Sequence, residues 1–245
     1  FVGSEVGIRA SAKVGLAGNG VAIASTMLLP NAKLVVTATN DIAIGGSGRI
    51  DLSGQPSMIQ KATVYGFGGT AIFNSSQGGF TQAAGSVIDV SATNASAGSI
   101  SISAGSGAVS FGGRLAGSAT GNNTSGDFSV TAASMSSTDF AALNALLTQG
   151  GLFDARSFDI KSGDLVIGDG VKAHSVTVSV DGGALTVAGT IDASGAAPGT
   201  IRLSAGNGVA RASTAVLDAH GPVLHTDRYR PPPQAKQPGH TATPP

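Results

Sequence analysis

Residues 175–203 read SVTVSVDGGALTVAGTIDASGAAPGTIRL, and this stretch decides the fold. Within it, residues 176–178, 185–187 and 201–203 each place one polar or charged residue between two apolar ones. Alternation with a period of two predicts short β-strands that bury one face. Asp181 and Gly182 separate the first two of these segments and favour a tight turn. The stretch therefore predicts short strands joined by tight bends.

The same pattern recurs along the chain at a nearly constant interval. A recurring apolar-x-apolar triplet and a recurring Ile-Asp-x-Ser phrase carry it. The triplets outside the quoted stretch are at 34–36, 100–102 and 128–130, and the phrases are at 50–53, 88–91 and 191–194, with a weaker copy at 217–220. Equivalent positions return at nearly the same separation in the pairs Ile88 and Leu115, Ile100 and Phe128, Val176 and Ile201, and Ile191 and Leu217. This separation falls within the range of about 20 to 50 residues that is typical of repeat architectures.

The repeat predicts an all-β fold, a parallel β-helix or solenoid in which each coil of three short strands stacks on the previous coil. Coils in such a stack lie about 4.8 Å apart, so every inward Ile or Val lies over an equivalent residue. Gly, Asn and Asp-Gly at the corners supply the bends. Short strands with frequent turns also occur in β-sandwiches, so a sandwich is the alternative architecture.

Two stretches interrupt the repeat. Residues 50–88 form a longer stretch than a coil needs, so we expect a loop insertion near 55–80, and insertions in solenoids often carry function. Residues 137–147 place apolar side chains at helical spacing behind a Ser/Thr cap, which predicts one short surface helix near 138–148.

The end of the chain differs in composition from the rest. Six of the ten prolines lie in the last fifteen residues, and proline cannot continue a hydrogen-bonded ladder. We therefore expect a β-helix segment over residues 1–227, followed by a Pro-rich disordered tail over residues 228–245.

Composition favours a thin, repeated core over a compact globule. Gly accounts for 37 of 245 residues, charged residues for 11% and aromatic residues for 4%, and such small side chains fill a narrow interior. The 14 basic residues balance the 14 acidic ones, so no net field attracts nucleic acid, and no nucleic-acid partner is expected. The chain has no Cys, which excludes disulfides and Cys-based metal sites.

Targeting signals are not expected in this chain. No apolar run reaches the roughly 18 residues of a transmembrane helix, so no membrane span is expected. The chain begins at Phe1, with no Met and no basic leader followed by an apolar stretch, and we interpret it as an internal fragment of a longer protein.

Residues 162–168, 187–195, 199–203 and 215–221 together resemble the C-terminal part of filamentous haemagglutinin family exoproteins, which Gram-negative bacteria export by two-partner secretion. The resemblance covers residues 85–225, and the part of the chain before Gly85 resembles the family only in its general sequence pattern. It implies a right-handed β-helix, export through an outer-membrane transporter barrel, a secreted or cell-surface location, and roles in adhesion, aggregation or biofilm. It supplies no catalytic residues. The N-terminal secretion domain of the family is not found here, and the Pro-rich end departs from the family's style.

Three groups of polar residues are candidates for chemistry, and each has a simpler structural interpretation. Four Asp residues that recur every five positions, and two Asp residues in Ile-Asp-x-Ser phrases, could bind Ca²⁺ or line a carbohydrate groove. Turn hydrogen bonds and corner capping explain them more simply, and the four His residues have no ligand spacing. The candidates are Asp154, Asp159, Asp164 and Asp169; Asp192 and Asp218; and His174, His220, His225 and His240. We predict no catalytic, cofactor-binding or metal-binding residue.

The function expected from these observations is that of a structural or adhesive segment and not of an enzyme. It would bind receptors or glycans on host or bacterial surfaces through broad faces or through the insertion near 55–80. The unpaired strand edges of its first and last coils would also favour end-to-end self-association.

Two other functions are alternatives. A carbohydrate-active β-helix enzyme of the polysaccharide lyase or hydrolase type is the main one, although Trp is absent and the only Tyr residues are Tyr65 and Tyr229, so platforms for sugar stacking are scarce. A toxin-delivery stalk is the other.

Overall fold

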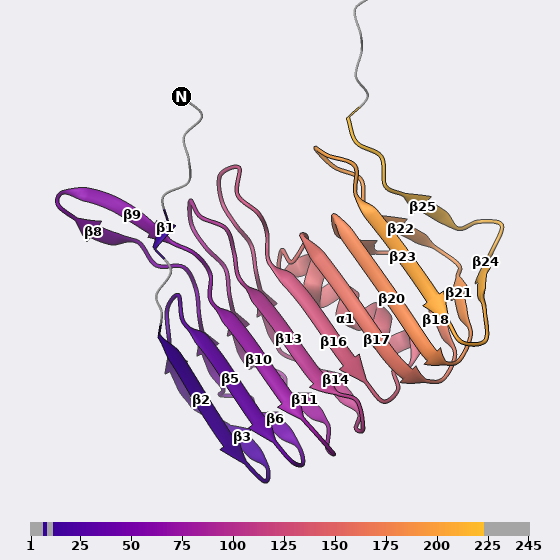
Figure 1. The fold of residues 1–245 in the computed structure, drawn as a ribbon, viewed down its shortest axis with the longest axis horizontal. Helices are drawn as coiled ribbons and strands as arrows, with labels where there is room; N and C mark the ends of the chain where they lie inside the picture. Colours follow the sequence, from indigo (N-terminus) through magenta and orange to yellow (C-terminus); the bar gives the residue numbers. More distant parts are fainter. Residues whose placement is uncertain (1–6, 9–11, 223–245) are drawn as a thin grey trace, which may run out of the picture.

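The computed structural model describes residues 7–8 and 12–222. The predicted tail, residues 228–245, lies outside the described residues. The described chain is elongated and consists of short strands with one helix (Figure 1). The all-β prediction is confirmed.

One parallel sheet of eight strands runs along the whole molecule (Figure 1). Its strands are the longest in the structure, and they add to the sheet in chain order. They are β2 (Lys13–Gly18), β5 (Lys33–Ala38), β10 (Thr70–Ser75), β13 (Ser99–Ala104), β16 (Asp127–Ala132), β17 (Ala155–Ser162), β20 (Ser175–Gly182) and β23 (Thr200–Ala205).

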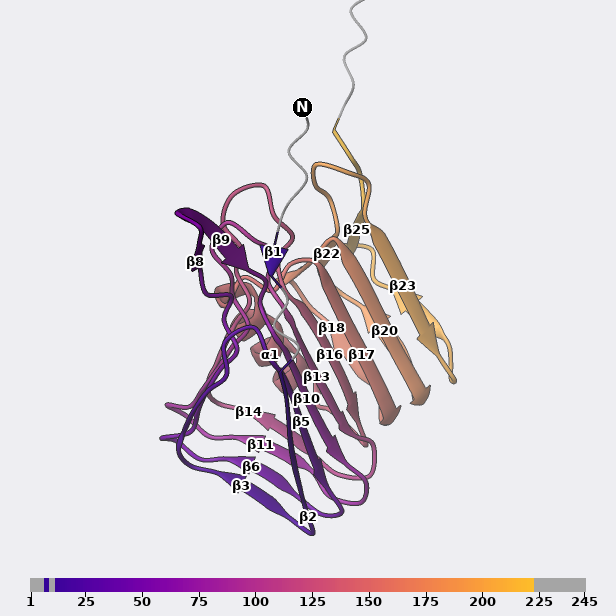
Figure 2. The ribbon, with the colours of Figure 1, turned by 60° about the vertical axis from the view of Figure 1, so that its left-hand side comes forward.

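Shorter strands build further parallel stacks beside this long sheet (Figure 2). Two stacks of four strands come before the helix. The first stack contains β3 (Val21–Ile23), β6 (Ile42–Ile44), β11 (Phe80–Gln82) and β14 (Val109–Phe111). The second stack contains β4 (Thr26–Leu28), β7 (Arg49–Asp51), β12 (Val87–Asp89) and β15 (Arg114–Ala116). Two stacks of three strands follow the helix. The first of these contains β18 (Leu165–Ile167), β21 (Leu185–Val187) and β24 (Val209–Arg211). The second contains β19 (Val171–Lys172), β22 (Thr190–Asp192) and β25 (Val216–Asp218).

The chain therefore passes through one long and two short strands before it returns to the long sheet, and we call this stretch a coil. All strand pairings in the described residues are parallel except the one within the hairpin formed by β8 (Ser57–Ile59) and β9 (Ala62–Gly66). A β-sandwich is built from antiparallel sheets, so the sandwich alternative is wrong. The arrangement is consistent with a β-helix.

The register of the strands matches the spacing found in the sequence. All four pairs of equivalent residues face each other on neighbouring strands, namely Ile88 and Leu115, Ile100 and Phe128, Val176 and Ile201, and Ile191 and Leu217. The interval is not constant elsewhere. Lys33 faces both Lys13 and Thr70. The separation in sequence is shorter than the usual interval between Lys13 and Lys33, and longer between Lys33 and Thr70.

The core is a set of apolar files, which are rows of facing inward residues, one from each successive strand, that run along the stack. Alternate residues of the long strands point inward, and in the six long strands from β5 to β20 the inward ones are almost completely buried. One file contains Val36, Phe73, Ile102, Val130 and Phe158. Full burial of each such side chain stabilises the fold by about 1.5–3 kcal/mol, so the files supply most of the favourable free energy.

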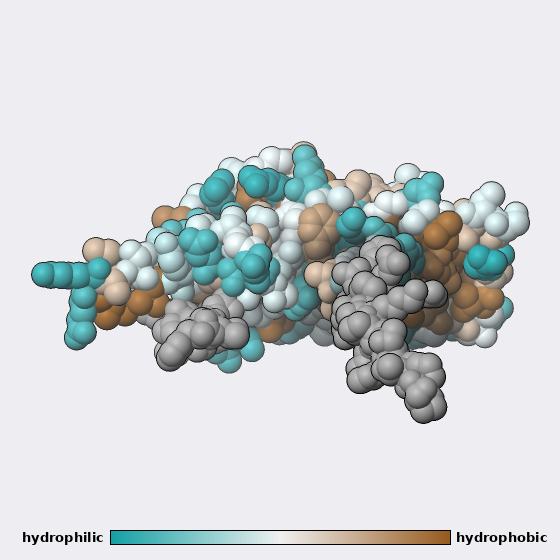
Figure 3. Space-filling model, turned by 90° about the horizontal axis from the view of Figure 1, so that it is seen from above, coloured by the Kyte–Doolittle hydropathy of each residue, from teal (hydrophilic) through white to brown (hydrophobic). Residues whose placement is uncertain are grey.

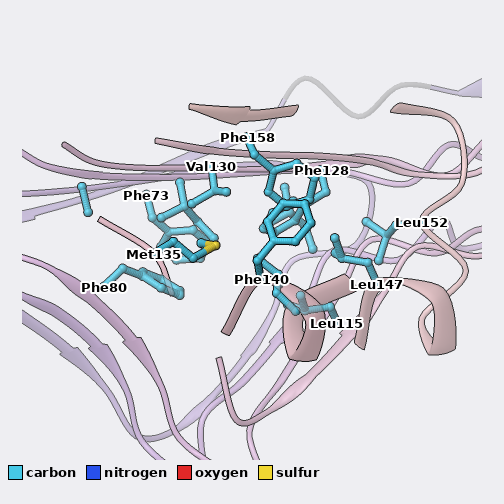
Figure 4. Packing of buried hydrophobic residues seen from close by; sticks show 14 of the residues in the cluster. Phe73, Phe80, Leu115, Phe128, Val130, Met135, Phe140, Leu147, Leu152 and Phe158 are labelled. Carbon is cyan, nitrogen blue, oxygen red and sulfur yellow. The ribbon is translucent and has the colours of Figure 1, made fainter. Parts of the chain in front are cut away.

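Phenylalanine rings link several of these files (Figure 4). Neighbouring ring centroids lie 4.7 to 6.2 Å apart, a spacing at which aromatic pairs attract each other. The series of contacts passes through Phe73, Phe80, Phe111, Phe128, Phe158 and Phe140. It connects the first half of the stack to the helix.

The insertion is shorter than the predicted 55–80. Only the β8–β9 hairpin leaves the stack, and β1 (Gly7–Ile8) pairs with its second strand (Figure 1). Residues 70–75 and 80–82 are regular strands β10 and β11, because Ala71, Phe73 and Phe80 occupy inward positions and are buried. The Gly-rich segments of this region lie at corners of the coil, and the sequence does not distinguish a corner from a longer loop.

The helix α1 (Ser137–Gln149) agrees with the helix predicted near 138–148. Ser136 caps it and accepts a hydrogen bond from the backbone N–H of Asp139 at 3.1 Å. The helix was expected on the surface, but it takes the place of the two short strands between β16 and β17, and it buries Phe140, Leu143 and Leu147. No helix in residues 7–8 and 12–222 is long and apolar enough to span a membrane.

Arg156 occupies an inward position that other strands give to apolar residues. It faces Phe128 on one side and Val176 on the other, and it is completely buried. Its guanidinium donates hydrogen bonds to the Leu152 carbonyl at 3.0 Å, to Asn144 Oδ1 at 3.1 Å and to Thr148 Oγ1 at 3.1 Å. Burial lowers its pKa to about 10, so it remains charged at neutral pH.

The helix explains this buried charge. The last turn of α1 contains no basic residue, and the C-terminal end of a helix carries partial negative charge. Arg156 supplies the missing cation, and it also supplies donors to polar groups that would otherwise be buried without partners.

Inward and outward positions should respond very differently to a charge. Ile191 is completely buried in β22, whereas Thr200 is exposed on β23. We expect Ile191→Asp to lower the free energy of unfolding by about 4 kcal/mol, because an unpaired charge enters the core, and Thr200→Asp to lower it by less than about 1 kcal/mol. Urea denaturation followed by circular dichroism measures both. Equal losses would show that the register is wrong.

A second prediction concerns Arg156. Arg156→Ala leaves a cavity and removes the donors to Asn144, Thr148 and Leu152, so we expect a loss of about 3 kcal/mol and a weaker helical signal. The matched control is Arg202→Ala, since Arg202 is exposed on the outer face of the long sheet. Its loss should stay below about 0.5 kcal/mol. A similar small loss for Arg156→Ala would contradict the structural role of its guanidinium.

Candidate functional site

The β8–β9 hairpin projects from one corner of the stack and carries exposed apolar side chains (Figure 1). Met58 is 74% exposed and Ile59 is 46% exposed, which are high values for apolar residues of a soluble surface. Gln60 and Lys61 form its two-residue turn with φ values of 46° and 68°. A turn with two positive φ angles suits Asn-Gly better than Gln-Lys, so the turn is strained.

Two adjoining hollows lie at the corner from which the hairpin leaves. The first, of about 200 Å³, is lined by residues 31–33 and 67–70. The second, of about 180 Å³, is lined by residues 67, 68, 70 and 96–99 and by Asp127. Because Phe67, Gly68 and Thr70 line both, the two hollows form one surface groove, which we call the corner groove. Lys33 lies at one end of it and Asp127 at the other.

Backbone forms the floor of the corner groove. A Cβ atom on Gly68 would lie 2.0 Å from the Val90 carbonyl oxygen, and one on Gly98 would lie 1.7 Å from the Gly69 carbonyl oxygen. Successive coils thus approach too closely here for any other residue. The hairpin is held beside the floor by Asn31, whose Oδ1 accepts a hydrogen bond from the Gln55 N–H at 3.0 Å.

Asp127 and Asp154 form a carboxyl pair at the far end of the groove. Asp127 lies at the start of β16, and Asp154 directly precedes β17, the next strand of the long sheet. Burial, followed by the charge of Asp154 and a hydrogen bond with it, raises the pKa of Asp127 to about 6. Asp127 Oδ1 is buried without a hydrogen-bond partner.

A carboxyl group with a raised pKa can act as a general acid, because it keeps its proton to a higher pH than an ordinary Asp does. Asp127 was not a candidate in the sequence, although a signal was present. It precedes Asp154 by 27 residues, one fewer than the separation between Phe128 and its facing residue Arg156, so the two Asp residues lie near each other on neighbouring coils without facing directly.

The structure separates the four Asp residues that recur between 154 and 169. Asp154 belongs to the pair with Asp127, and Asp159 forms an ion pair with Lys161 at 2.8 Å. Asp164 Oδ1 accepts a hydrogen bond from the Ala184 N–H, and Asp169 Oδ1 accepts one from the Thr190 N–H, both at 2.8 Å. The last two thus tie one coil to the next, whereas the simpler interpretation expected hydrogen bonds within their own turns.

The Asp residues of the Ile-Asp-x-Ser phrases close corners of the coil. In each phrase the carboxylate accepts hydrogen bonds from the backbone N–H and the hydroxyl of the Ser two residues later. The residue pairs are Asp51 and Ser53, Asp89 and Ser91, and Asp192 and Ser194. The weaker copy does the same with a histidine, as Asp218 accepts from the His220 N–H at 3.1 Å.

Asp192 and Asp218 face each other on adjacent strands, as the carbohydrate-groove hypothesis required. Each is occupied by local partners, however. Hydrogen bonds from Ser194 and then Lys172 lower the pKa of Asp192 to about 2, and His220 lowers the pKa of Asp218. Both therefore stay ionised near neutral pH and have no proton to donate, which does not suit general acid chemistry.

The histidines do not assemble into a site in the described part of the chain. His220 Nδ1 contacts Asp218 at 2.5 Å, whereas His174 contributes backbone hydrogen bonds, and His225 and His240 lie outside the described residues. Among residues 7–8 and 12–222, no group of three or more His, Cys, Asp or Glu side chains could hold a metal ion.

Comparison with known proteins adds no relative, since no family model, no curated protein and no solved structure matches the chain. The corner groove, the hairpin and the Asp127–Asp154 pair are therefore interpreted from their own geometry.

The carboxyl pair should make stability depend on pH. Between about pH 4 and pH 6 the folded state keeps a proton on Asp127 that the unfolded state has released, so stability falls as the pH rises through this window. The unscreened effect would be about 3 kcal/mol, and solvent screening of this partly exposed group reduces it to about 1 kcal/mol.

Asp127→Asn removes this proton. Between pH 4.5 and pH 7 the free energy of unfolding of the unmodified chain should fall, and that of the Asp127→Asn variant should fall by about 1 kcal/mol less. Urea denaturation at a series of pH values measures both. Asp164→Asn is the control, since it removes a carboxylate that ties two coils but has no carboxyl partner. If Asp127→Asn and the unmodified chain have the same pH dependence, the pKa of Asp127 is not raised in the folded state.

Proposed function

We propose that the chain is a structural and adhesive segment of a large, secreted bacterial surface exoprotein, and that it mediates attachment or aggregation. The exoprotein is of the filamentous haemagglutinin kind and leaves a Gram-negative cell by two-partner secretion through an outer-membrane transporter. It acts outside the cell, either secreted or at the cell surface.

The observation that carries this proposal is the unbroken parallel sheet from β2 to β23 (Figure 1). A stack in which each coil contacts mainly its neighbours makes a stiff rod, and its length is set by the number of coils. Stiffness and length suit a stalk that carries binding surfaces away from a cell.

In this proposal the coil is a right-handed β-helix. The supporting argument is general, because a connection that leaves one parallel strand and returns to its neighbour in the same sheet is right-handed in about 98% of cases. Each coil here makes such a connection between neighbouring strands of the long sheet.

The adhesive part is assigned to the corner groove and the β8–β9 hairpin. Met58 and Ile59 offer apolar contact, whereas Lys33 and Asp127 place opposite charges at the two ends of the groove. A polar groove beside an exposed apolar hairpin suits a surface glycan or a receptor loop, since such ligands present both hydroxyl or charged groups and apolar faces.

A carbohydrate-active enzyme is the second candidate, and one observation favours it. Asp127 lines the groove and interacts with the carboxyl group of Asp154, and the raised pKa of Asp127 suits a general acid. The geometry is less favourable to this candidate, because Asp154 lines neither hollow of the groove, so only one of the two carboxyl groups faces a bound ligand.

The adhesive assignment is tested by binding of the tagged chain to host epithelial cells, to Gram-negative cells and to a glycan array. The double substitution of Met58→Ser with Ile59→Ser should weaken binding at least about tenfold, because loss of two apolar anchors at the centre of a contact costs a few kcal/mol. The matched control is Val166→Ser, since Val166 is also exposed, at 44%, but lies on β18.

Two results would contradict the proposal. Unchanged binding in the hairpin variant would remove the hairpin from the adhesive surface. Release of reducing ends from a polysaccharide near pH 5, abolished by Asp127→Asn and by Asp154→Asn, would favour the enzyme.

A further inference from the structure

We propose that the corner groove binds a two-ring unit of a linear acidic polysaccharide, with a uronate ring in the hollow beside Lys33 and a neutral ring in the hollow beside Asp127. The groove would then supply the sugar specificity of the adhesive function proposed above, on which this inference rests.

The groove runs along the axis of the stack and not along a strand. Lys33, Thr70, Ser99 and Asp127 are the first residues of β5, β10, β13 and β16, and they face one another in register. Neighbouring strands of a sheet lie about 4.8 Å apart, so roughly 14 Å separates Lys33 from Asp127. One pyranose unit lengthens a linear polysaccharide by about the same distance as one strand spacing. A polysaccharide that lies along the groove therefore stays in step with the coils.

Each hollow has the size of a single small ring. The two volumes are about 200 Å³ and about 180 Å³, whereas pockets for drug-sized ligands occupy about 300–1,000 Å³. Phe67 lines both hollows and is partly exposed. Since the C–H face of a sugar ring packs well on an aromatic side chain, two linked rings can share the side chain of Phe67.

The main chain that lines the groove is already hydrogen-bonded within the stack. The backbone N–H groups of Gly68, Thr70, Gly98 and Ser99 donate to the carbonyls of Ser96, Ala32, Val90 and Gly69, at 3.0, 3.0, 2.7 and 3.1 Å respectively. A peptide that adds a strand to a sheet needs such main-chain groups as partners. The groove instead offers hydroxyl and charged side chains, which recognise sugar hydroxyls and carboxylates. This favours a saccharide over a receptor loop.

Lys33 makes the first hollow suitable for an anion. Its side chain is exposed, and Lys13, which faces it on β2, adds a second positive charge at the same end. Within the described residues neither lysine belongs to an ion pair. A ring carboxylate placed here gains a charge-assisted hydrogen bond that a neutral ring does not form.

Asp127 makes the second hollow suitable for a neutral ring. The nearby carboxyl group of Asp154 adds negative charge, which disfavours a second carboxylate of the ligand. Asp127 Oδ1 is buried without a hydrogen-bond partner, and a small rotation of the carboxyl group turns it towards the hollow. A ring hydroxyl that donates to this oxygen removes the cost of leaving it unpaired.

The middle of the groove is lined by hydroxyl groups. Ser99 Oγ lies 3.4 Å from Thr70 Oγ1, and the two side chains belong to neighbouring coils. A hydroxyl both donates and accepts, as does each hydroxyl of a sugar. The pair therefore suits the region where two linked rings meet.

The hairpin adds an apolar contact beside this polar site. Figure 3 shows the side of the molecule from which the hairpin projects, with hydrophilic surface at its tip on the left and hydrophobic surface behind the tip. Met58 and Ile59 belong to the exposed apolar side chains of the hairpin. The hairpin thus gives affinity for the surface that carries the polysaccharide, whereas the groove selects the sugar.

Two disaccharides that differ in one group test the inference. Cellobiuronate consists of a glucuronate ring linked to a glucose ring, and cellobiose has a hydroxymethyl group in place of the carboxylate. We expect the chain to bind cellobiuronate at least about fivefold more tightly than cellobiose at neutral pH and low salt, because only the former pairs with Lys33. A ligand-observed NMR titration measures both affinities.

Three variants assign the contacts. Lys33→Gln should remove the preference for cellobiuronate and leave the affinity for cellobiose unchanged, whereas Thr70→Val should weaken both disaccharides by the same factor of at least about three. Arg202→Gln is the matched control for Lys33→Gln, since it removes an exposed positive charge from the same face of the long sheet, outside the groove. It should leave the preference intact. Thermal melts verify that the variants are folded.

Four results would overturn the proposal: equal affinities for the two disaccharides, a preference that persists in Lys33→Gln, no binding of cellobiuronate at millimolar concentration, or tighter binding of an acetylated triglutamate peptide than of cellobiuronate. The last result would mean that the groove recognises an acidic peptide. None of these measurements involves the hairpin residues, so failure of the sugar assignment is distinguishable from failure of the adhesive function, which the cell-binding test of the Met58 and Ile59 variant decides.

Discussion

Parallel main-chain hydrogen bonding between successive coils is the interaction on which the rest of the structure depends. It fixes each residue opposite its equivalent on the next coil, so inward positions become continuous files and outward positions become a regular surface. A core one coil wide can be filled by Val, Ile, Leu and Ala, which explains how a chain with 4% aromatic residues forms a buried interior. The same close stacking brings backbones together at the corners, and there Gly68 and Gly98 leave no space for a side chain.

The helix α1 is the place where this constraint is relaxed, and its surroundings show the physical consequences. The long sheet continues because β16 and β17 still pair, but the two short stacks end and new ones begin beyond the helix. The helix fills the gap with Phe140, Leu143 and Leu147, and its C-terminal turn needs a cation and hydrogen-bond donors. Arg156 meets both needs from an inward position. A guanidinium is thus tolerated in an apolar file because a helix end, absent from the other coils, lies against it.

The candidate site follows from the same architecture. A coil can carry extra residues at a corner without disturbing the pairing of its strands, so the β8–β9 hairpin and the corner groove lie at the edge of an otherwise regular stack. Stacking also brings Asp127 and Asp154 close together from neighbouring coils. Partial burial and the nearby carboxyl group of Asp154 then raise the pKa of Asp127, and Asp127 would not have this property in an isolated coil.

The sequence by itself determined the all-β class, the coil interval and the helix, because each depends on a local pattern. The alternation in residues 175–203, the recurrence of Ile-Asp-x-Ser and the capped apolar spacing of residues 137–147 can be read without any distant contact, and the register confirms the four spacings derived from them. The tertiary structure decided what depends on contacts between coils: the true extent of the insertion, the partners of the Asp residues, the burial of Arg156 and the Asp127–Asp154 pair. Those features could not be predicted, since short and long coils alternate irregularly, and a difference of a few residues at one corner changes which side chains face each other on the next.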